Sequence, residues 1–192
     1  GQYVLMLKGV FARMTKRTVL KELIFKEIDE LIIGSLWIVG FLSFFIGGVV
    51  ALQTALNLSN PLIPKTLIAF AARQSIILEF SPTFISIIMA GKVGSFITSS
   101  IGSMRVTEQI DALEVMGVNS LNYLIFPKII AMLTYPFVIA ISMFLGIIGA
   151  YASAVLGGFV GSDTFLTGLQ DDFEGYHIFY AFFKTFLFAF IL

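Results

Sequence analysis

Two long blocks of the sequence contain no charged residue, and this constrains the fold more than any other feature. They run over residues 31–64 and 129–162. Each exceeds the roughly 20 apolar residues that an α-helix needs to cross about 30 Å of hydrocarbon. The 192-residue chain is 58% hydrophobic and only 12% charged, with a mean hydropathy of +0.97. A soluble domain carries about twice that share of charge. The sequence therefore predicts an all-α integral membrane protein with multiple transmembrane helices.

The apolar runs predict a single transmembrane domain over residues 1–192. Its expected membrane segments are 31–56, 66–104, 124–160 and 176–192. The second segment is interrupted by Arg73, Glu79, Pro82 and Lys92, so it fits either one bent span or a re-entrant piece followed by a span. The last run is still apolar at Leu192, which suggests that a further C-terminal span is missing.

The first 28 residues differ from the rest, because they hold six of the 12 Lys and Arg residues. Apolar residues recur there at helical spacing, at Tyr3, Leu7, Val10 and Met14. This pattern predicts an amphipathic helix over 1–28 that lies in the membrane interface, with its basic side toward lipid phosphates. The alternative is a solvated basic leader that only sets the topology.

The distribution of Lys and Arg predicts the orientation. The leader and the loop 105–128 carry positive charge, whereas the loop 163–174 carries four acids and neither Lys nor Arg. Because positive loops stay in the cytoplasm, we expect the first two there and the third outside. The zero net charge argues against a nucleic-acid partner, and the lack of cysteine excludes thiol catalysis.

Small residues recur at four-residue spacing in two of the apolar segments, which predicts close helix packing. One stripe is Gly91, Ser95, Ser99 and Ser103, and the other is Ser142, Gly146, Ala150, Ala154 and Gly158. Each stripe fits packing within one subunit or contact between two copies of the chain.

A short polar segment, 105–117, separates the second and third apolar regions. Thr107 is expected to cap a helix there, and Gly117 to end it in the left-handed conformation. The expected apolar face holds Val106, Ile110 and Leu113, and the expected acidic face holds Glu108, Asp111 and Glu114. Such a helix suits docking on a soluble partner, although structurally bland loops also contain short helices.

Five motifs carry a family resemblance. They are Glu79 with Pro82, Ala90-Gly91-Lys92-Val93-Gly94, Gly102-Ser103-Met104, Thr107-Glu108-Gln109-Ile110-Asp111-Ala112-Leu113 and Pro127-Lys128. Together they resemble the signature region of MlaE-type permeases, the membrane subunits of ABC transporters that move phospholipids between the membranes of a two-membrane envelope. The chain departs from the pattern at four positions: Ser81 replaces Gly, Ser100 replaces Glu, and lysine replaces arginine at Lys92 and Lys128. The change at Ser100 puts in doubt any mechanism that depends on that Glu.

The resemblance implies that residues 105–117 form a coupling helix that docks on a cytoplasmic ABC ATPase. The implied coupling residues are Arg105, Thr107, Glu108, Gln109, Asp111, Leu113 and Glu114. It also implies a permease homodimer in the cell inner membrane, a periplasmic MCE-domain partner and a phospholipid substrate. The chain has no G-x-x-x-x-G-K-[ST] phosphate loop, so ATP hydrolysis is expected in the partner. No catalytic residue, cofactor or metal is expected in the chain itself.

The charged residues within the second apolar segment allow two interpretations. Glu79 is a lipid-path candidate, expected to pair with Arg73 or Lys92 or to face a lipid head group. The alternative is a structural ion pair or snorkelling to an interface, which we favour for Lys92. A secondary transporter or channel driven by ion flow is the rival function. It needs ionisable groups spread along a pathway, and this chain offers one cluster.

Overall fold

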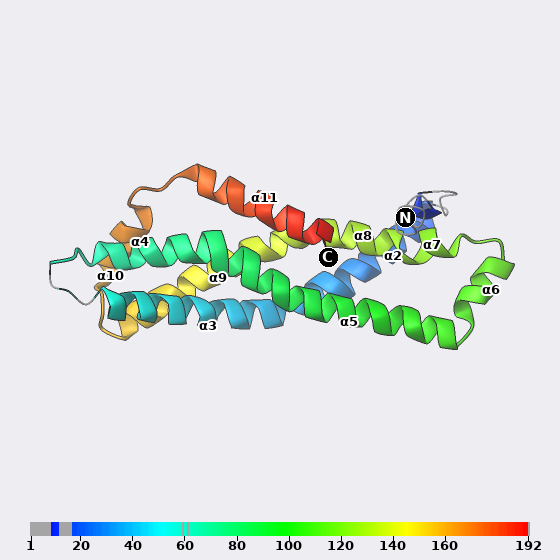
Figure 1. Cartoon of the computed structure of the whole chain (residues 1–192), viewed down its shortest axis with the longest axis horizontal. Coiled ribbons are helices and arrows are strands. Elements are labelled where there is room, and N and C mark those ends of the chain that lie inside the picture. The colour runs from blue at the N-terminus through cyan, green and yellow to red at the C-terminus, as the bar shows by residue number, and fades with distance from the viewer. Residues whose placement is uncertain (1–8, 12–16, 59, 61, 192) are drawn as a thin grey trace. The chain divides into compact units, whose positions relative to one another are not determined.

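The computed structural model describes residues 9–11, 17–58, 60 and 62–191 (Figure 1), and in that part the chain is helical without a β-strand. The helices are α2 Arg17–Ile28, π-helix η1 Asp29–Ile33, α3 Gly34–Asn57, α4 Thr66–Ser75, π-helix η2 Ile76–Phe84, α5 Ile85–Val106, α6 Gln109–Val115, α7 Ser120–Leu124, α8 Phe126–Leu133, α9 Tyr135–Leu156, α10 Ser162–Gln170 and α11 Gly175–Ile191. The predicted all-α class is confirmed for these residues.

Three helical stretches of the described chain are long and apolar enough to cross a membrane. They are Arg17–Asn57 and Thr66–Val106, of 41 residues each, and Ser120–Leu156, of 37 residues. At 1.5 Å per residue the longest measure about 60 Å, about twice the hydrocarbon thickness. The second apolar region is thus one helical stretch, α4–η2–α5, with the π-helical part around Pro82.

Helix α9 ends at Leu156, four residues before the expected end of the third membrane segment at residue 160. Gly158 takes the left-handed conformation, with φ +73°. The amide of Gly158 then bonds the carbonyl of Val155, and the amide of Phe159 bonds that of Ala154, at 3.1 Å. This pair of bonds is the Schellman motif that ends α-helices. Residues 1–8 and 12–16 of the expected interfacial helix lie outside the described residues, and residues 17–28 form α2.

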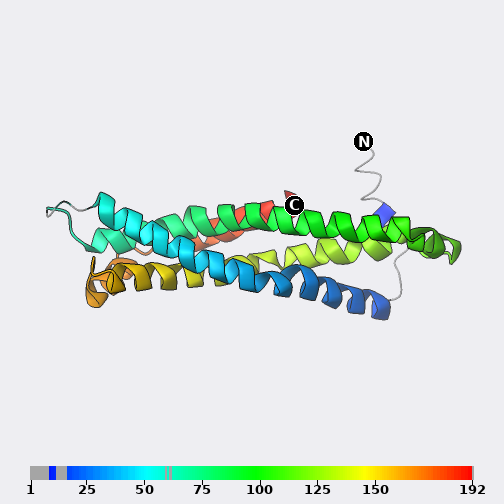
Figure 2. The same ribbon diagram turned by 90° about the horizontal axis from the view of Figure 1, so that it is seen from below.

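The chain divides into two compact units. The first unit holds residues 1–35 and 89–135, and within it α2 packs on α8 and α7 packs on α8. The second unit holds residues 36–88 and 136–191. Within it α10 packs on α4, and α11 packs along η2. Figure 2 shows the same ribbon from a second direction.

In the second unit, glycines bring α3 and α9 into backbone contact. A β-carbon added to Gly47 would overlap the carbonyl oxygen of Gly146, and one added to Gly149 would overlap that of Phe44. One turn before Gly47 and Gly146, the hydroxyls of Ser43 and Ser142 are joined by a 2.8 Å hydrogen bond. The stripe that begins at Ser142 is therefore internal packing within one chain.

The stripe on α5 has a different environment. Gly91 and Gly102 are exposed, and a β-carbon on either would meet no described atom within 4 Å. Ser95, Ser99 and Ser103 are also exposed. This face of α5 is thus open in the single chain.

The two stripes predict opposite outcomes for the same substitution. Gly47→Ala forces the backbones of α3 and α9 apart, and overpacking of this kind costs about 1–3 kcal/mol. Gly91→Ala meets open space, and alanine is favoured over glycine in a helix by roughly 0.5–1 kcal/mol. Thermal unfolding in detergent should therefore show a lower melting temperature for Gly47→Ala and no loss for Gly91→Ala. Equal melting temperatures would contradict the backbone contact.

Candidate functional site

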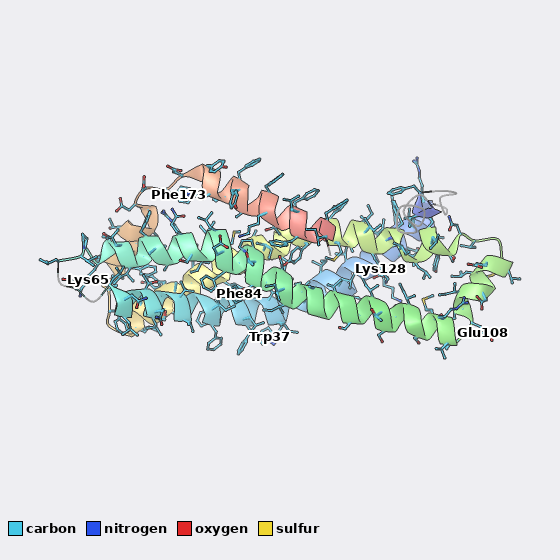
Figure 3. All side chains as sticks on the ribbon, in the orientation of Figure 1. Trp37, Lys65, Phe84, Glu108, Lys128 and Phe173 are labelled. Carbon is cyan, nitrogen blue, oxygen red and sulfur yellow. The ribbon has the colours of Figure 1, made fainter. Side chains whose placement is uncertain are left out.

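The polar segment between the second and third long stretches forms the short helix α6 (Figure 3). The expected helix covered residues 105–117, whereas α6 covers Gln109–Val115. Arg105 instead belongs to the last turn of α5. Figure 3 labels Glu108 at the end of α5, where the chain turns into α6.

The start of α6 differs from the prediction. The hydroxyl of Thr107 donates to the carbonyl of Ser103 at 2.8 Å, so Thr107 completes the hydrogen bonding of α5 and does not cap α6. The N-cap residue is Glu108, with φ +57° and no hydrogen bond from its side chain to the helix end. A non-glycine residue in the left-handed region costs about 1–2 kcal/mol. Such backbone strain is a feature of functional sites.

The end of α6 agrees with the prediction. Gly117 has φ +75°, its amide bonds the carbonyl of Glu114 at 2.9 Å, and the amide of Val118 bonds that of Leu113 at 3.0 Å. This is a Schellman motif. The left-handed glycine expected at this position is confirmed.

Two polar contacts connect α6 to its flanking segments. Arg105 Nη1 lies 2.7 Å from Asp111 Oδ1, and Ser120 Oγ donates to Glu114 Oε1 at 3.0 Å. Because both members of the Arg105–Asp111 pair are more than half exposed, this ion pair contributes little stability. Both contacts are exposed, so they connect α6 to the segments on either side of it but contribute little to its stability.

The expected apolar face is only partly correct. Ile110 and Leu113 are half-buried, but Val106 is 84% exposed because it lies on α5 and not on α6. The apolar residues that α6 exposes most are at its other end, where Val115 is 89% and Met116 68% exposed. All seven residues of α6 are described, and none is buried.

Two asparagines that sequence analysis did not single out attach the leader to α7. Asn119 caps α7 by accepting from the amides of Leu121 and Asn122, and its own amide donates to the carbonyl of Gly9 at 3.0 Å. Asn122, which is fully buried, donates to the carbonyl of Val10 at 2.7 Å. An asparagine before a helix is a recognisable capping signal, but nothing in the sequence connects it to residue 9.

Lys128, where the family pattern has arginine, forms a buried ion pair with Glu27 of α2. Its ammonium also lies 5.7 Å from the centre of the Phe96 ring. Lysine bonds only one oxygen of the carboxylate here, and Glu27 Oε2 has no hydrogen-bond partner among the described residues. This pair joins α2 to α8 within the first unit.

Lys92 has a structural role, although its partners are not carboxylates. Its ammonium donates to the carbonyl of Gly34 at 2.7 Å and to Ser35 Oγ at 2.8 Å. These groups lie where π-helix η1 passes into α3. Neighbouring side chains of this kind satisfy backbone groups that an irregular membrane helix leaves free.

Glu79 pairs with neither Arg73 nor Lys92, the two ion-pair partners expected from the sequence. Its carboxylate lies 2.9 Å from the ammonium of Lys184 on α11. Lys184 also donates to the carbonyl of Leu78 at 3.0 Å. Leu78 lies within π-helix η2, one turn before Pro82, which has no amide hydrogen. The Glu79 side chain is 63% exposed.

Arg73 is buried and binds the end of α10. Its guanidinium donates to the carbonyls of Leu169 at 2.5 Å, Asp171 at 3.0 Å and Asp172 at 3.2 Å. A cation at a helix C-terminus also interacts favourably with the helix dipole. Arg73 therefore organises the acidic loop after α10.

The described residues contain no group of three or more acids and histidines that could hold a metal ion.

The sequence is similar to a family of membrane permeases. The sequence pattern of the family described as Permease MlaE matches residues 24–192. The chain belongs to the MlaE permease family. It is 34% identical to a probable ABC transporter permease protein of Rickettsia bellii over 88% of this chain and 66% of the relative. It is 32% identical to one of Synechocystis over 59% of this chain and 44% of the relative.

The chain spans less than the full length of these family members. The match to a probable ABC transporter permease protein of Rickettsia conorii, at 33% identity, covers 82% of this chain but 61% of that protein. The described geometry therefore concerns about two thirds of the length of the rickettsial permeases.

The strained start of α6 predicts the effect of glycine there. Glu108→Gly removes a left-handed cost of about 1–2 kcal/mol and should slow hydrogen exchange of the α6 amides. The control is Gln109→Gly, which adds glycine to a helical position, costs about 1 kcal/mol and should speed exchange. Faster exchange in both variants would contradict the left-handed conformation of Glu108.

Proposed function

We propose that the chain is the permease subunit of an ABC transporter that moves phospholipids between the inner and outer membranes. Its family membership and its relatives' names support the ABC permease part of this proposal. A separate cytoplasmic ATPase subunit supplies the energy, because the chain carries no phosphate loop. The further partners are a second copy of the chain and a periplasmic MCE-domain protein, all at the inner membrane.

The observation that carries the proposal is α6. It is a short helix between two long apolar stretches, and none of its residues is buried. It presents Glu108, Asp111 and Glu114, and residues 106–127 contain neither Lys nor Arg. A water-exposed, acidic helix of this kind suits a groove with basic residues on a cytoplasmic ATPase.

The open face of α5 supports the homodimer. In lipid, helices associate by close backbone approach, so small residues mark contact faces. Gly91, Ser95 and Ser99 offer such a face, and no part of the described chain covers the two glycines at positions 91 and 102. The other small-residue stripe is already used between α3 and α9.

The charged residues give little support to an ion-driven transporter. Arg73 and Lys92 donate to backbone carbonyls or a hydroxyl of their own units. Both cations thus stabilise the backbone of their own units and are not placed along an ion pathway by these contacts. The Glu79–Lys184 pair remains, with an exposed carboxylate in the middle of a long stretch. An exposed carboxylate there is costly in hydrocarbon, which supports the role of Glu79 beside a polar lipid head group.

Charge reversal on α6 tests the docking role. The double variant Glu108→Lys and Asp111→Lys should reduce ATPase recovered with the purified permease by about tenfold or more, equivalent to ~1.4 kcal/mol, because it opposes a basic partner surface. The control is Asp163→Lys at the start of α10 with Glu174→Lys in the loop that follows α10, which should leave recovery unchanged. Full ATPase recovery with the α6 variant would count against the docking role.

Substitution of Glu79 tests the lipid path. Glu79→Ala leaves Lys184 free to bond the Leu78 carbonyl, so the complex should assemble and melt normally. Phospholipid transfer between vesicles by the reconstituted complex should fall several-fold. Glu79→Gln keeps the shape of the side chain but removes its negative charge. Comparison of the two variants therefore separates the contribution of the charge from that of the side chain's shape. Normal transfer by an assembled Glu79→Ala complex would remove Glu79 from the lipid path.

A further inference from the structure

We infer that the ATPase is anchored by the apolar end of α6, Val115 and Met116, while the acids orient the approach. This inference rests on the proposed function, because it takes the ATPase as the occupant of the surface. It differs from the sequence-based expectation, which had Leu113 as the apolar contact. Leu113 is half-buried against its own chain, so little of it is left for a partner.

Exposure distinguishes the two ends of α6. Val115, the last residue of α6, and Met116, its C-cap, are 89% and 68% exposed and give this end an apolar projection. As consecutive residues their side chains do not face each other, so they offer a partner two apolar contacts. Binding energy at protein interfaces concentrates in a few apolar or aromatic anchors, and the surrounding charges contribute less. The acids lie along the same helix and suit the periphery of such a contact, where charge mainly affects the association rate.

The projection is held in a fixed direction. The Schellman motif at Gly117 ends the helix directly after Met116. The contact between Glu114 and Ser120 then attaches this end of α6 to the start of α7. An anchor that is already ordered before binding loses less conformational entropy on binding.

A hollow lies beside the projection. It has a volume of about 570 Å³ and is lined by Glu114, Gly117, Val118, Asn119, Ser120 and Leu121. The lining combines a carboxylate with apolar atoms of Val118 and Leu121. This combination suits a Lys or Arg of the partner, whose alkyl stem packs on apolar surface while its charged end meets a carboxylate. We therefore infer a partner surface with an apolar pocket and an adjacent basic side chain.

The test uses the full-length permease co-expressed with its ATPase subunit and measures the ATPase recovered per permease. Val115→Gln with Met116→Gln introduces good helix formers but removes the apolar projection, and should lower recovery at least tenfold. Val115→Ile with Met116→Leu keeps the apolar surface and should retain recovery. Val106→Gln removes an equally exposed apolar residue from α5 and should also retain it.

The role of the hollow as a site for a basic side chain of the ATPase is tested with Glu114→Gln, again by the ATPase recovered per permease. This variant should weaken recovery severalfold and reduce its sensitivity to salt, because one charge pair is lost. Full recovery with the Val115/Met116 glutamine variant would overturn the anchor while leaving the proposed function intact. An equal loss of ATPase recovery in the Val106→Gln variant would also overturn the role of Val115 and Met116 as the anchor. Absence of ATPase from the wild-type permease would instead refute the proposed function.

Discussion

In a bilayer, backbone amides and carbonyls cannot bond water, and this constraint determines which contacts the charged residues make. Lys92 donates to the carbonyl of Gly34 beside η1, and Lys184 donates to that of Leu78 within η2. Arg73 donates to three carbonyls at and after the end of α10. All three cations thus donate to backbone carbonyls within a π-helix, at its end, or at and after the end of an α-helix, where the last carbonyls lack a helical donor.

Close packing of α3 and α9 is a second consequence of the lipid environment. Without water to drive apolar surfaces together, helices gain most from close backbone approach. Gly47 and Gly146 allow that approach, and the Ser43–Ser142 bond satisfies the hydroxyls at the same contact. The second unit depends on these small residues more than on large side chains. Its buried cluster, among the described residues, contains six alanines.

Local features could be predicted from the sequence, whereas contacts between distant residues could not. The uncharged blocks predicted helices, and Gly117 predicted a left-handed C-cap, because each depends on a few neighbouring residues. The partner of Glu79 is 105 residues away, and that of Lys128 is 101 residues away. Composition and spacing do not encode such pairs. Thr107 was a local prediction that failed, because its hydroxyl has two possible backbone partners and bonds the preceding helix.

The asparagine contacts with the leader have a consequence for how that segment is recognised. Asn119 and Asn122 bond the carbonyls of Gly9 and Val10, which every amino acid possesses. These two bonds therefore depend on the backbone of residues 9 and 10 and not on their side chains, apart from residue 9, where a β-carbon would lie 2.8 Å from Leu121 Cδ1. Amide and carbonyl groups also carry no net charge and do not titrate, so salt screens the hydrogen bonds between them only a little. The attachment of the leader to α7 should thus persist across conditions that weaken the exposed Arg105–Asp111 pair.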